Sequence, residues 1–153
     1  MSTMLTINNP TIEVPLGQLL LNAQQWTFQG ILHLMAERGH TAFTVAHLMF
    51  LANLDCGTTH ASLVAKRMGV SRQAVYRTTK ELQALDVLTL ENDLQKRNQK
   101  IIRMTPHGTK VVLDARDCLN TVEVTLKGRL GVRDFERLSN ILRLDWGPIL
   151  GES

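Results

Sequence analysis

The sequence predicts a mainly α-helical protein that carries one small β-hairpin. Three observations support this fold class. Apolar residues recur with the helical period over most of the chain. Gly69 interrupts a helix-prone stretch over residues 63–82, which indicates two short helices joined by a tight turn. The pattern then becomes β-like in two short runs, 87–92 and 100–105, before helical spacing returns.

The composition is that of one globular domain with extensions. The chain has 153 residues, of which 44% are apolar, so it can form a real core. No apolar run approaches the roughly 18 residues of a membrane span, and the first residues do not resemble a signal peptide. Cys56 and Cys118 are isolated and lack metal-ligand spacing. We therefore expect a cytoplasmic protein without a membrane partner.

Positive charge is concentrated in the middle of the chain. Residues 60–110 contain ten Lys and Arg against four acidic residues, a net charge of +6. The remainder has seven basic and ten acidic residues, a net charge of −3. This asymmetry suggests a polyanionic partner, although a solvated basic face would give the same pattern.

The first part of the chain predicts an arm followed by two helices. Residues 1–15 contain two prolines and no periodicity, which is typical of an extended arm. Helical spacing of apolar residues begins at Leu16 and ends near Gly39, a residue suited to stop a helix. Thr44 can cap a second helix, 45–54, which is apolar on almost every side and should lie in the core.

The middle of the chain predicts a helix-turn-helix. Thr58 or Thr59 can cap a third helix, which Gly69 ends, and Ser71 can cap a fourth that runs to about Leu85. Two helices that cross steeply need a small residue at the crossing, and Ala65 occupies that position. The internal apolar contacts are expected from Val64, Met68, Val70 and Val75.

A β-hairpin and two further helices follow. The β-like runs flank a polar, basic tip at residues 93–99. Thr105 can cap the next helix, with Pro106 at its first position, and the apolar spacing continues to about Lys127. Gly128 and Gly131 predict a break. A last helix over residues 132–144 carries Phe135, Leu138, Ile141 and Leu142 on one face.

The second helix of a helix-turn-helix is the element that reads DNA. Arg72, Gln73 and Arg77 project away from the face that packs through Val75. Arginine can form bidentate hydrogen bonds to guanine, and glutamine can do so to adenine. Candidates for phosphate contacts, which position a protein without reading sequence, are Ser71, Tyr76 and Lys80 with Thr59 and Lys66. The plainer interpretation of each is an exposed polar helix face.

The order of these elements, with "MTPHG" at residues 104–108 opening a long helix, resembles the MarR family of winged-helix transcriptional regulators. That family has a Leu-Thr-x-x-Gly run at this point. Its wing often carries Asp-Arg-Arg, where this sequence has Lys96, Arg97 and Asn98. The resemblance implies that Arg97 enters the minor groove beside Lys96, Asn98 and Lys100, but the bracing aspartate is lost. The glycine usual before the first strand is also missing, because Asp86 stands there.

The resemblance implies a homodimeric, sequence-specific regulator of double-stranded DNA, most simply a repressor that binds an imperfect palindrome. Residues 16–40 and 106–153 would form a helical dimerisation region, and 41–105 the winged helix-turn-helix. Physical reasoning agrees, since a 22-residue helix after Pro106 extends about 33 Å and exceeds what a small winged domain can cover. The alternative is that the terminal helices form a bundle within one chain.

The resemblance also implies a small-molecule effector pocket. Trp26, His33 and Phe50 are conceivable lining residues, although core packing is the more usual role for Trp26 and Phe50. His33 and Glu37 form an i, i+4 pair that we interpret as a surface contact. Cys118 lies on the apolar side of its helix, which favours an inert core thiol over a redox sensor.

No other pattern points to an enzyme, a cofactor or a metal site. Histidines 33, 40, 47, 60 and 107 lack metal-ligand spacing with Cys or acidic residues. The alternative function is a winged-helix protein-interaction module without DNA binding, which would fit a wing that lacks its aspartate. RNA binding is disfavoured, because only 5% of the residues are aromatic.

Overall fold

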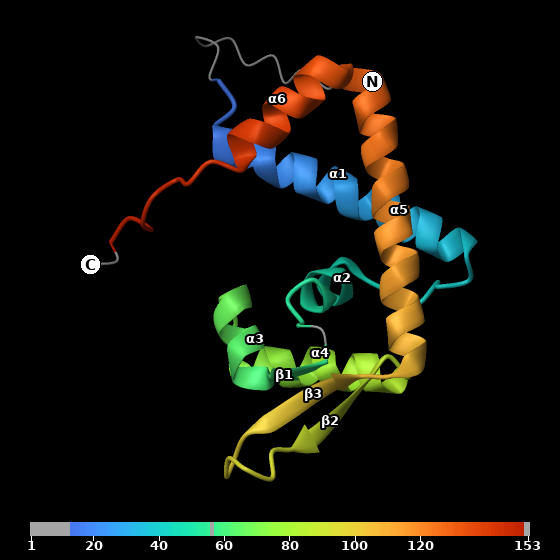
Figure 1. Cartoon of the computed structure of the whole chain (residues 1–153), viewed down its shortest axis with the longest axis vertical. Helices are drawn as coiled ribbons and strands as arrows, with labels where there is room; N and C mark the ends of the chain where they lie inside the picture. Colours follow the sequence, from blue (N-terminus) through green and yellow to red (C-terminus); the bar gives the residue numbers. More distant parts are fainter. Residues whose placement is uncertain (1–12, 56, 152–153) are drawn as a thin grey trace, which may run out of the picture.

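The computed structural model describes residues 13–55 and 57–151. These residues form a mainly helical fold with one small antiparallel sheet, which lies at the lower end of Figure 1. The elements are α1 Leu16–Glu37, α2 Val45–Leu51, β1 Thr58–His60, α3 Ala61–Met68, α4 Arg72–Ala84, β2 Leu88–Asn92, β3 Lys100–Met104, α5 Pro106–Leu130 and α6 Val132–Leu142. Among these described elements, no helix is long and apolar enough to cross a membrane.

The long helix α5 connects two parts of the molecule (Figure 1). Its first half packs on the sheet and lies beside α2, whereas its second half crosses α1 and leads into α6. The predicted arm at residues 1–15 falls almost wholly outside the described residues. The part that carries α2 to β3 is compact, and the terminal helices lie at the other end of α5.

The predicted hairpin is confirmed, and a third strand joins it. β2 pairs with β3 from Leu88 opposite Met104 to Asn92 opposite Lys100. β1, which the sequence did not predict, pairs with the other edge of β3. The prediction that Thr58 or Thr59 caps α3 is therefore wrong, because these residues lie in β1 and the N-cap position is His60, one residue after Thr59.

One core runs from α1 through α2, α3 and α4 to the sheet, and α5 packs along it. Phe50, Leu82 and Val111 are fully buried there, together with Leu88 of β2 and Ile102 of β3. Burial of each such side chain contributes about 1.5–3 kcal/mol. The apolar stretch over 45–54 is thus a core segment as predicted, although its helix ends at Leu51.

The turn between α3 and α4 follows the prediction. Gly69 adopts φ 63°, a left-handed conformation that glycine takes without a Cβ penalty. Val64 and Ala65 are buried at the crossing, and Val75 packs against them in the same core. Val70 is 39% exposed, so the prediction that it supplies an internal contact is wrong. Val70 follows the turn directly, where the chain has not yet returned to the packed face.

The "MTPHG" run has a clear structural reason. Thr105 caps α5 by accepting a hydrogen bond from the Gly108 amide at 2.8 Å, and its own amide donates to the Val87 carbonyl at 3.0 Å. A Cβ atom at Gly108 would lie 1.8 Å from that carbonyl oxygen, so only glycine lets α5 approach the start of β2. Asp86, in place of the usual glycine, adopts φ 55°. Asp tolerates this left-handed conformation better than most residues.

The terminal helices differ from the prediction at one point. Helix α5 continues through Gly128 and ends only at Gly131, where φ is 85°. The predicted break at Gly128 is therefore wrong, since one glycine inside a long helix costs only about 1 kcal/mol. Helix α6 then leaves the end of α5 at a steep angle and runs toward the start of α1 (Figure 1), and none of its residues is buried.

Candidate nucleic-acid interface

Helix α4 presents its polar face outward because its other face is fixed in the core. Ser71 caps it, since its hydroxyl accepts a hydrogen bond from the Ala74 amide at 3.1 Å. Val75, Thr79 and Leu82 recur at helical spacing and are buried. The Thr79 hydroxyl is satisfied within the helix, where it donates to the Val75 carbonyl at 2.7 Å.

A second contact holds the far end of α4 against α2. His47 accepts a hydrogen bond from the Thr44 amide through Nδ1, and its Nε2 lies 2.9 Å from a Glu81 carboxylate oxygen. With Nδ1 acting as an acceptor, Nε2 is the nitrogen that donates a hydrogen bond to the Glu81 carboxylate. The Thr44 cap of α2 and the position of α4 are thus coupled through one imidazole.

The six residues predicted on the reading helix are all exposed. The Lys80 ammonium lies 5.3 Å from the centroid of the Tyr76 ring, so these two side chains associate on the helix surface. The predicted set comprises Ser71, Arg72, Gln73, Tyr76, Arg77 and Lys80.

The wing is organised by a residue that the sequence did not single out. One Asp93 carboxylate oxygen accepts hydrogen bonds from the backbone amides of Gln95 and Lys96, at 2.8 and 3.2 Å. The other lies 2.9 Å from Nε2 of His60. The hydrogen bond from His60, followed by that from the Gln95 amide, holds the pKa of Asp93 below its usual range. Position 96, where the MarR family often has an aspartate, is a lysine here. Asp93, three residues earlier, is the carboxylate that orders this wing.

The structure brings α4 and the wing together around one cleft of about 520 Å³. Arg72, Gln73 and Tyr76 line one side, and Arg97 and its neighbours line the other. The wing residues at the cleft are Arg97, Asn98, Gln99 and Lys100, and the remaining lining residues are Ala61, Ser62, Thr79 and Leu90. Ser62 and Gln99 were not predicted, because only the pairing of the strands places them beside α4.

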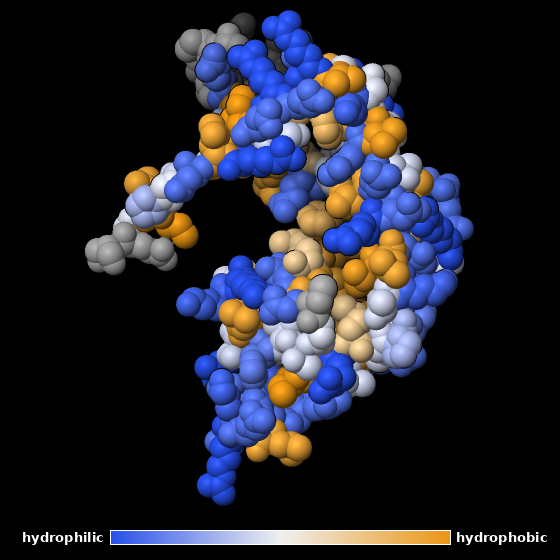
Figure 2. Space-filling model, in the orientation of Figure 1, coloured by the Kyte–Doolittle hydropathy of each residue, from blue (hydrophilic) through white to orange (hydrophobic). Residues whose placement is uncertain are grey.

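Several predicted residues lie outside this cleft. Lys96 is exposed at the wing tip, and Arg77 and Lys80 are exposed along α4. Figure 2 shows mostly hydrophilic side chains at the lower end of the molecule, where the wing lies, with a few hydrophobic ones among them. The surface that carries these residues is therefore continuous with the cleft but wider than it.

The basic residues of this surface are free of acidic partners within the described chain. No carboxylate of residues 13–55 or 57–151 forms an ion pair with Arg72, Arg77 or Arg97, and the same holds for Lys80 and Lys96. Three other basic residues of the same segment are paired: Arg67 with Asp55, Arg103 with Glu91 and Lys110 with Asp114. Within residues 60–110, the basic side chains without an acidic partner thus lie mainly on α4 and the wing, with Lys66 on α3 beside them.

The two predicted backbone contacts have different positions. Lys66 is exposed in the last turn of α3. Thr59 is 2% exposed, and its hydroxyl accepts a hydrogen bond from the Asp55 amide at 2.9 Å. The prediction that Thr59 contacts a phosphate is therefore wrong, since its place in β1 turns the side chain inward.

The three residues predicted to line an effector pocket do not line one common pocket in the structure. Trp26 and His33 line a hollow of about 420 Å³ between α1 and α5, and the guanidinium of Arg129 lies 5.9 Å from the Trp26 ring. Phe50 is fully buried in the core, so it is not a lining residue. Trp26 is 41% exposed and does not pack in the core. His33 contacts Glu37 at 3.5 Å on the surface, as predicted.

The remaining chemistry-bearing residues form no further site in the part of the chain that the structure describes. No group of three His, Cys, Asp or Glu residues between 13 and 151, Cys56 aside, is placed to hold a metal ion. Cys118 is fully buried, as predicted, and burial raises the pKa of its thiol. Cys56 lies outside the described residues.

Comparison with known proteins identifies the class of fold. No known family model matches the sequence, and no curated protein matches it. Among solved structures, apo MarR from E. coli superposes with a TM-score of 0.72 at 15% identity, over 85% of this chain and 96% of that chain. The transcriptional repressor CouR, bound to a 23-mer DNA duplex, gives 0.70 at 23% identity over 84% and 89%.

A third structure extends this likeness. BpsR from Bordetella bronchiseptica, whose DNA binding is regulated by 6-hydroxynicotinic acid, gives a TM-score of 0.66 at 21% identity, over 83% of this chain and 95% of that chain. The chain therefore has a winged helix-turn-helix fold. More narrowly, it has the fold of the MarR-family regulators, in agreement with the resemblance of its sequence.

Proposed function

We propose that this protein is a MarR-family transcriptional regulator that binds double-stranded DNA. The observation that carries the proposal is the cleft shared by α4 and the wing, with unpaired Arg72 and Arg97 on its two sides. A convex reading helix beside a basic hairpin matches the two grooves of a duplex. The fold that this chain shares with DNA-bound CouR supports the same arrangement.

In this mode of binding, α4 enters the major groove. Arg72 and Gln73 stand in its first turn, where side chains of a reading helix reach base edges. Arg77 lies one turn further along the exposed face, and Tyr76 and Lys80 are placed for phosphates. Ser71 is partly committed to capping the helix, so its contact would be a secondary one.

The wing would enter the adjacent minor groove. Arg97 is the central residue of this contact, since it faces the same cleft as Arg72. Lys96, Asn98 and Lys100 supply further polar contacts around it, and Lys66 of α3 is an additional phosphate contact. Asn98 has φ 66°, a left-handed conformation that turns the chain back toward β3.

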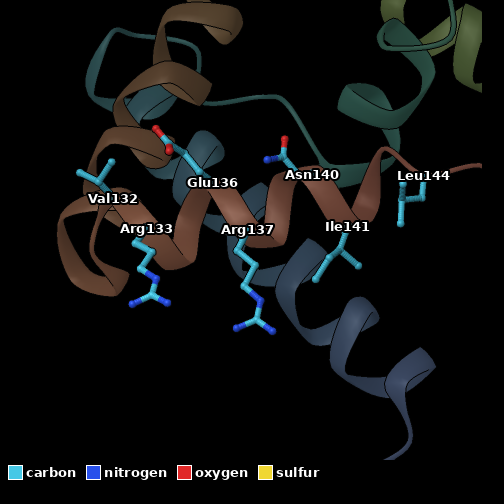
Figure 3. Close-up of a pocket in the computed structure, with 7 residues that line it drawn as sticks. All are labelled: Val132, Arg133, Glu136, Arg137, Asn140, Ile141 and Leu144. Atoms are coloured by element: carbon cyan, nitrogen blue, oxygen red, sulfur yellow. The ribbon is translucent and has the colours of Figure 1, made fainter.

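We further propose that the regulator is a homodimer formed through α1, α5 and α6. Helix α6 has no buried residue, although Leu138, Ile141 and Leu142 are apolar and 42–49% exposed. Figure 3 shows Arg133, Arg137 and Ile141 projecting from one side of α6, with Leu144 just past the end of the helix, around one open pocket. A second copy would cover these side chains, since large apolar patches of single chains mark interfaces.

A dimer places two reading helices on one face of the DNA. The target would then be an imperfect palindrome with half-sites about one helical turn apart. We infer repression as the simplest outcome of such binding. An effector would act by changing the distance between the two reading helices, and the hollow beside Trp26 and His33 is the proposed place for it.

Fluorescence anisotropy with a labelled duplex tests the proposal. A complex with about six phosphate contacts should lose affinity with a log-log salt slope near −5. Arg97→Ala should weaken binding to all sequences, whereas Arg72→Ala and Gln73→Ala should also relax sequence preference. Arg116→Ala removes an exposed arginine on α5, away from the cleft, and should leave binding unchanged.

The alternative function predicts a different result. A winged-helix module that binds only proteins would show no duplex binding at physiological salt, whichever arginine is replaced. Light scattering tests the dimer separately: we expect about 34 kDa, twice the 17.2 kDa of one chain. A 17 kDa species at micromolar concentration would contradict the dimer.

A further inference from the structure

His60 occupies a junction between three elements. It is the last residue of β1, where it pairs with Ile101 of β3, and it precedes the first turn of α3. Its ring reaches beyond β3 to the end of β2, where Nε2 lies 2.9 Å from Asp93. A single side chain thus connects the start of the helix-turn-helix with the start of the wing tip.

Asp93 uses both carboxylate oxygens to order that tip. Oδ1 accepts the amides of Gln95 and Lys96, which closes a tight turn at the first residues of the loop. Oδ2 is the partner of His60. The backbone amide of Asp93 also donates to the Gln99 carbonyl at 2.9 Å, where the loop returns. The Asp93 side chain is only 9% exposed, so it is a structural centre of the wing.

The His60–Asp93 pair adjoins the cleft. Ala61 and Ser62 follow His60 directly and line one part of the cleft, and Arg97 lies four residues after Asp93 on another part. The wing otherwise joins the rest of the fold through its strands. A contact at its base therefore limits how far the tip can swing relative to α4.

We propose that His60 and Asp93 are positioning residues, which hold Arg97 of the wing at a set distance from the reading helix. The inference rests on the proposed DNA-binding function for its consequence, but its structural part does not depend on DNA. Asp93 would then brace the wing arginine, as the aspartate at the position of Lys96 is expected to do in the MarR family. An aspartate is ionised at neutral pH even at its ordinary pKa, and the hydrogen bonds from His60 and the Gln95 amide lower the pKa of Asp93 further.

Limited trypsin digestion tests the structural part without DNA. The wing offers cleavage sites after Lys96, Arg97 and Lys100. His60→Leu and Asp93→Ala should raise the rate of nicking there by about tenfold, because cleavage follows the population of open loop. His60→Gln retains an amide donor in the place of Nε2 and should stay within about twofold of the wild type. His107→Ala, an exposed histidine outside the pair, is the matched control.

A double-mutant cycle tests the functional part on the duplex enriched from a random pool. Arg97→Ala should weaken binding about tenfold in the wild-type background, which corresponds to one good groove contact. In the Asp93→Ala background the same change should weaken binding only about twofold, because the arginine is no longer held in place. His60→Leu should weaken binding to the duplex, whereas His60→Gln, which keeps a donor to Asp93, should bind like the wild type. A general loss of stability would not separate these two variants.

The outcomes separate this inference from the proposed function. Unchanged nicking in both His60→Leu and Asp93→Ala overturns the inference, whether or not the protein binds DNA. Equal effects of Arg97→Ala in both backgrounds also overturn it, while leaving DNA binding intact. Failure of every variant and of the wild type to bind any duplex overturns the proposed function, and the nicking rates then still decide whether the pair holds the wing.

Discussion

Replacement of Gly108 with alanine tests the packing of α5 on the winged domain. The new Cβ atom would lie 1.8 Å from the Val87 carbonyl oxygen and 2.8 Å from the Met104 sulfur. Carbon and oxygen cannot approach much closer than about 3 Å, so α5 and the start of β2 must separate by more than 1 Å. The Val87 carbonyl also accepts the Thr105 amide, and a separation would break that hydrogen bond.

The magnitude follows from these two effects. Overpacking costs about 1–3 kcal/mol, and the lost hydrogen bond adds about 1 kcal/mol. We therefore expect a loss of about 3 kcal/mol in the free energy of unfolding. For a chain of this size, 1 kcal/mol changes Tm by about 2–4 °C, so the variant should melt about 9 °C lower.

Thermal unfolding followed by circular dichroism measures this loss. Gly128→Ala makes the same substitution in the same helix, at a site where nothing beyond the neighbouring residues and the local helix backbone lies within 4 Å of the new Cβ. It should stabilise the helix by about 0.5–1 kcal/mol. A drop of less than about 3 °C for Gly108→Ala would refute the close approach of α5 to Val87.

Three further predictions concern other contacts. Thr105→Val removes the cap of α5 and should lower stability by about 1–2 kcal/mol, as measured by urea unfolding. The hydrogen bond from His40 lowers the pKa of Asp114, so this contact should stabilise the fold above about pH 4 and be lost as the pH falls through the lowered pKa. In Asp114→Asn, the free energy of unfolding should therefore depend less on pH in this acidic range, and an unchanged pH profile would contradict the contact. In a Cys56→Ser background, Cys118 should react with iodoacetamide only in denaturant, and rapid labelling of the native protein would contradict its burial.

Much of the fold could be predicted because its signals are local. Thr44, Ser71 and Thr105 each cap a helix through an amide three residues further on, and Gly69 ends α3 by its own conformation. The two β-like runs of the hairpin are likewise recognised from residues only a few positions apart. Such features depend on neighbours in the sequence, so the pattern alone indicates them.

The unpredicted features depend on residues far apart in the chain. β1 has three residues and exists because the free edge of β3, about 40 positions later, accepts it. The burial of Thr59 follows from that pairing. His60 and Asp93 are separated by 33 positions, and neither belongs to a recognisable motif. The sequence predicted the arginines of the candidate cleft. It did not predict Ser62 or Gln99, because only the pairing of the strands brings these two residues to the cleft.

Selection of bound duplexes from a random DNA pool tests the central claim most directly. The wild-type protein, at 150 mM salt, should enrich one imperfect palindrome whose half-sites are about 10 base pairs apart. Arg72→Ala should relax the enriched sequence at a defined position of each half-site. A pool that shows no enrichment after several rounds, or a single unrepeated half-site, would contradict a dimer that reads DNA through α4.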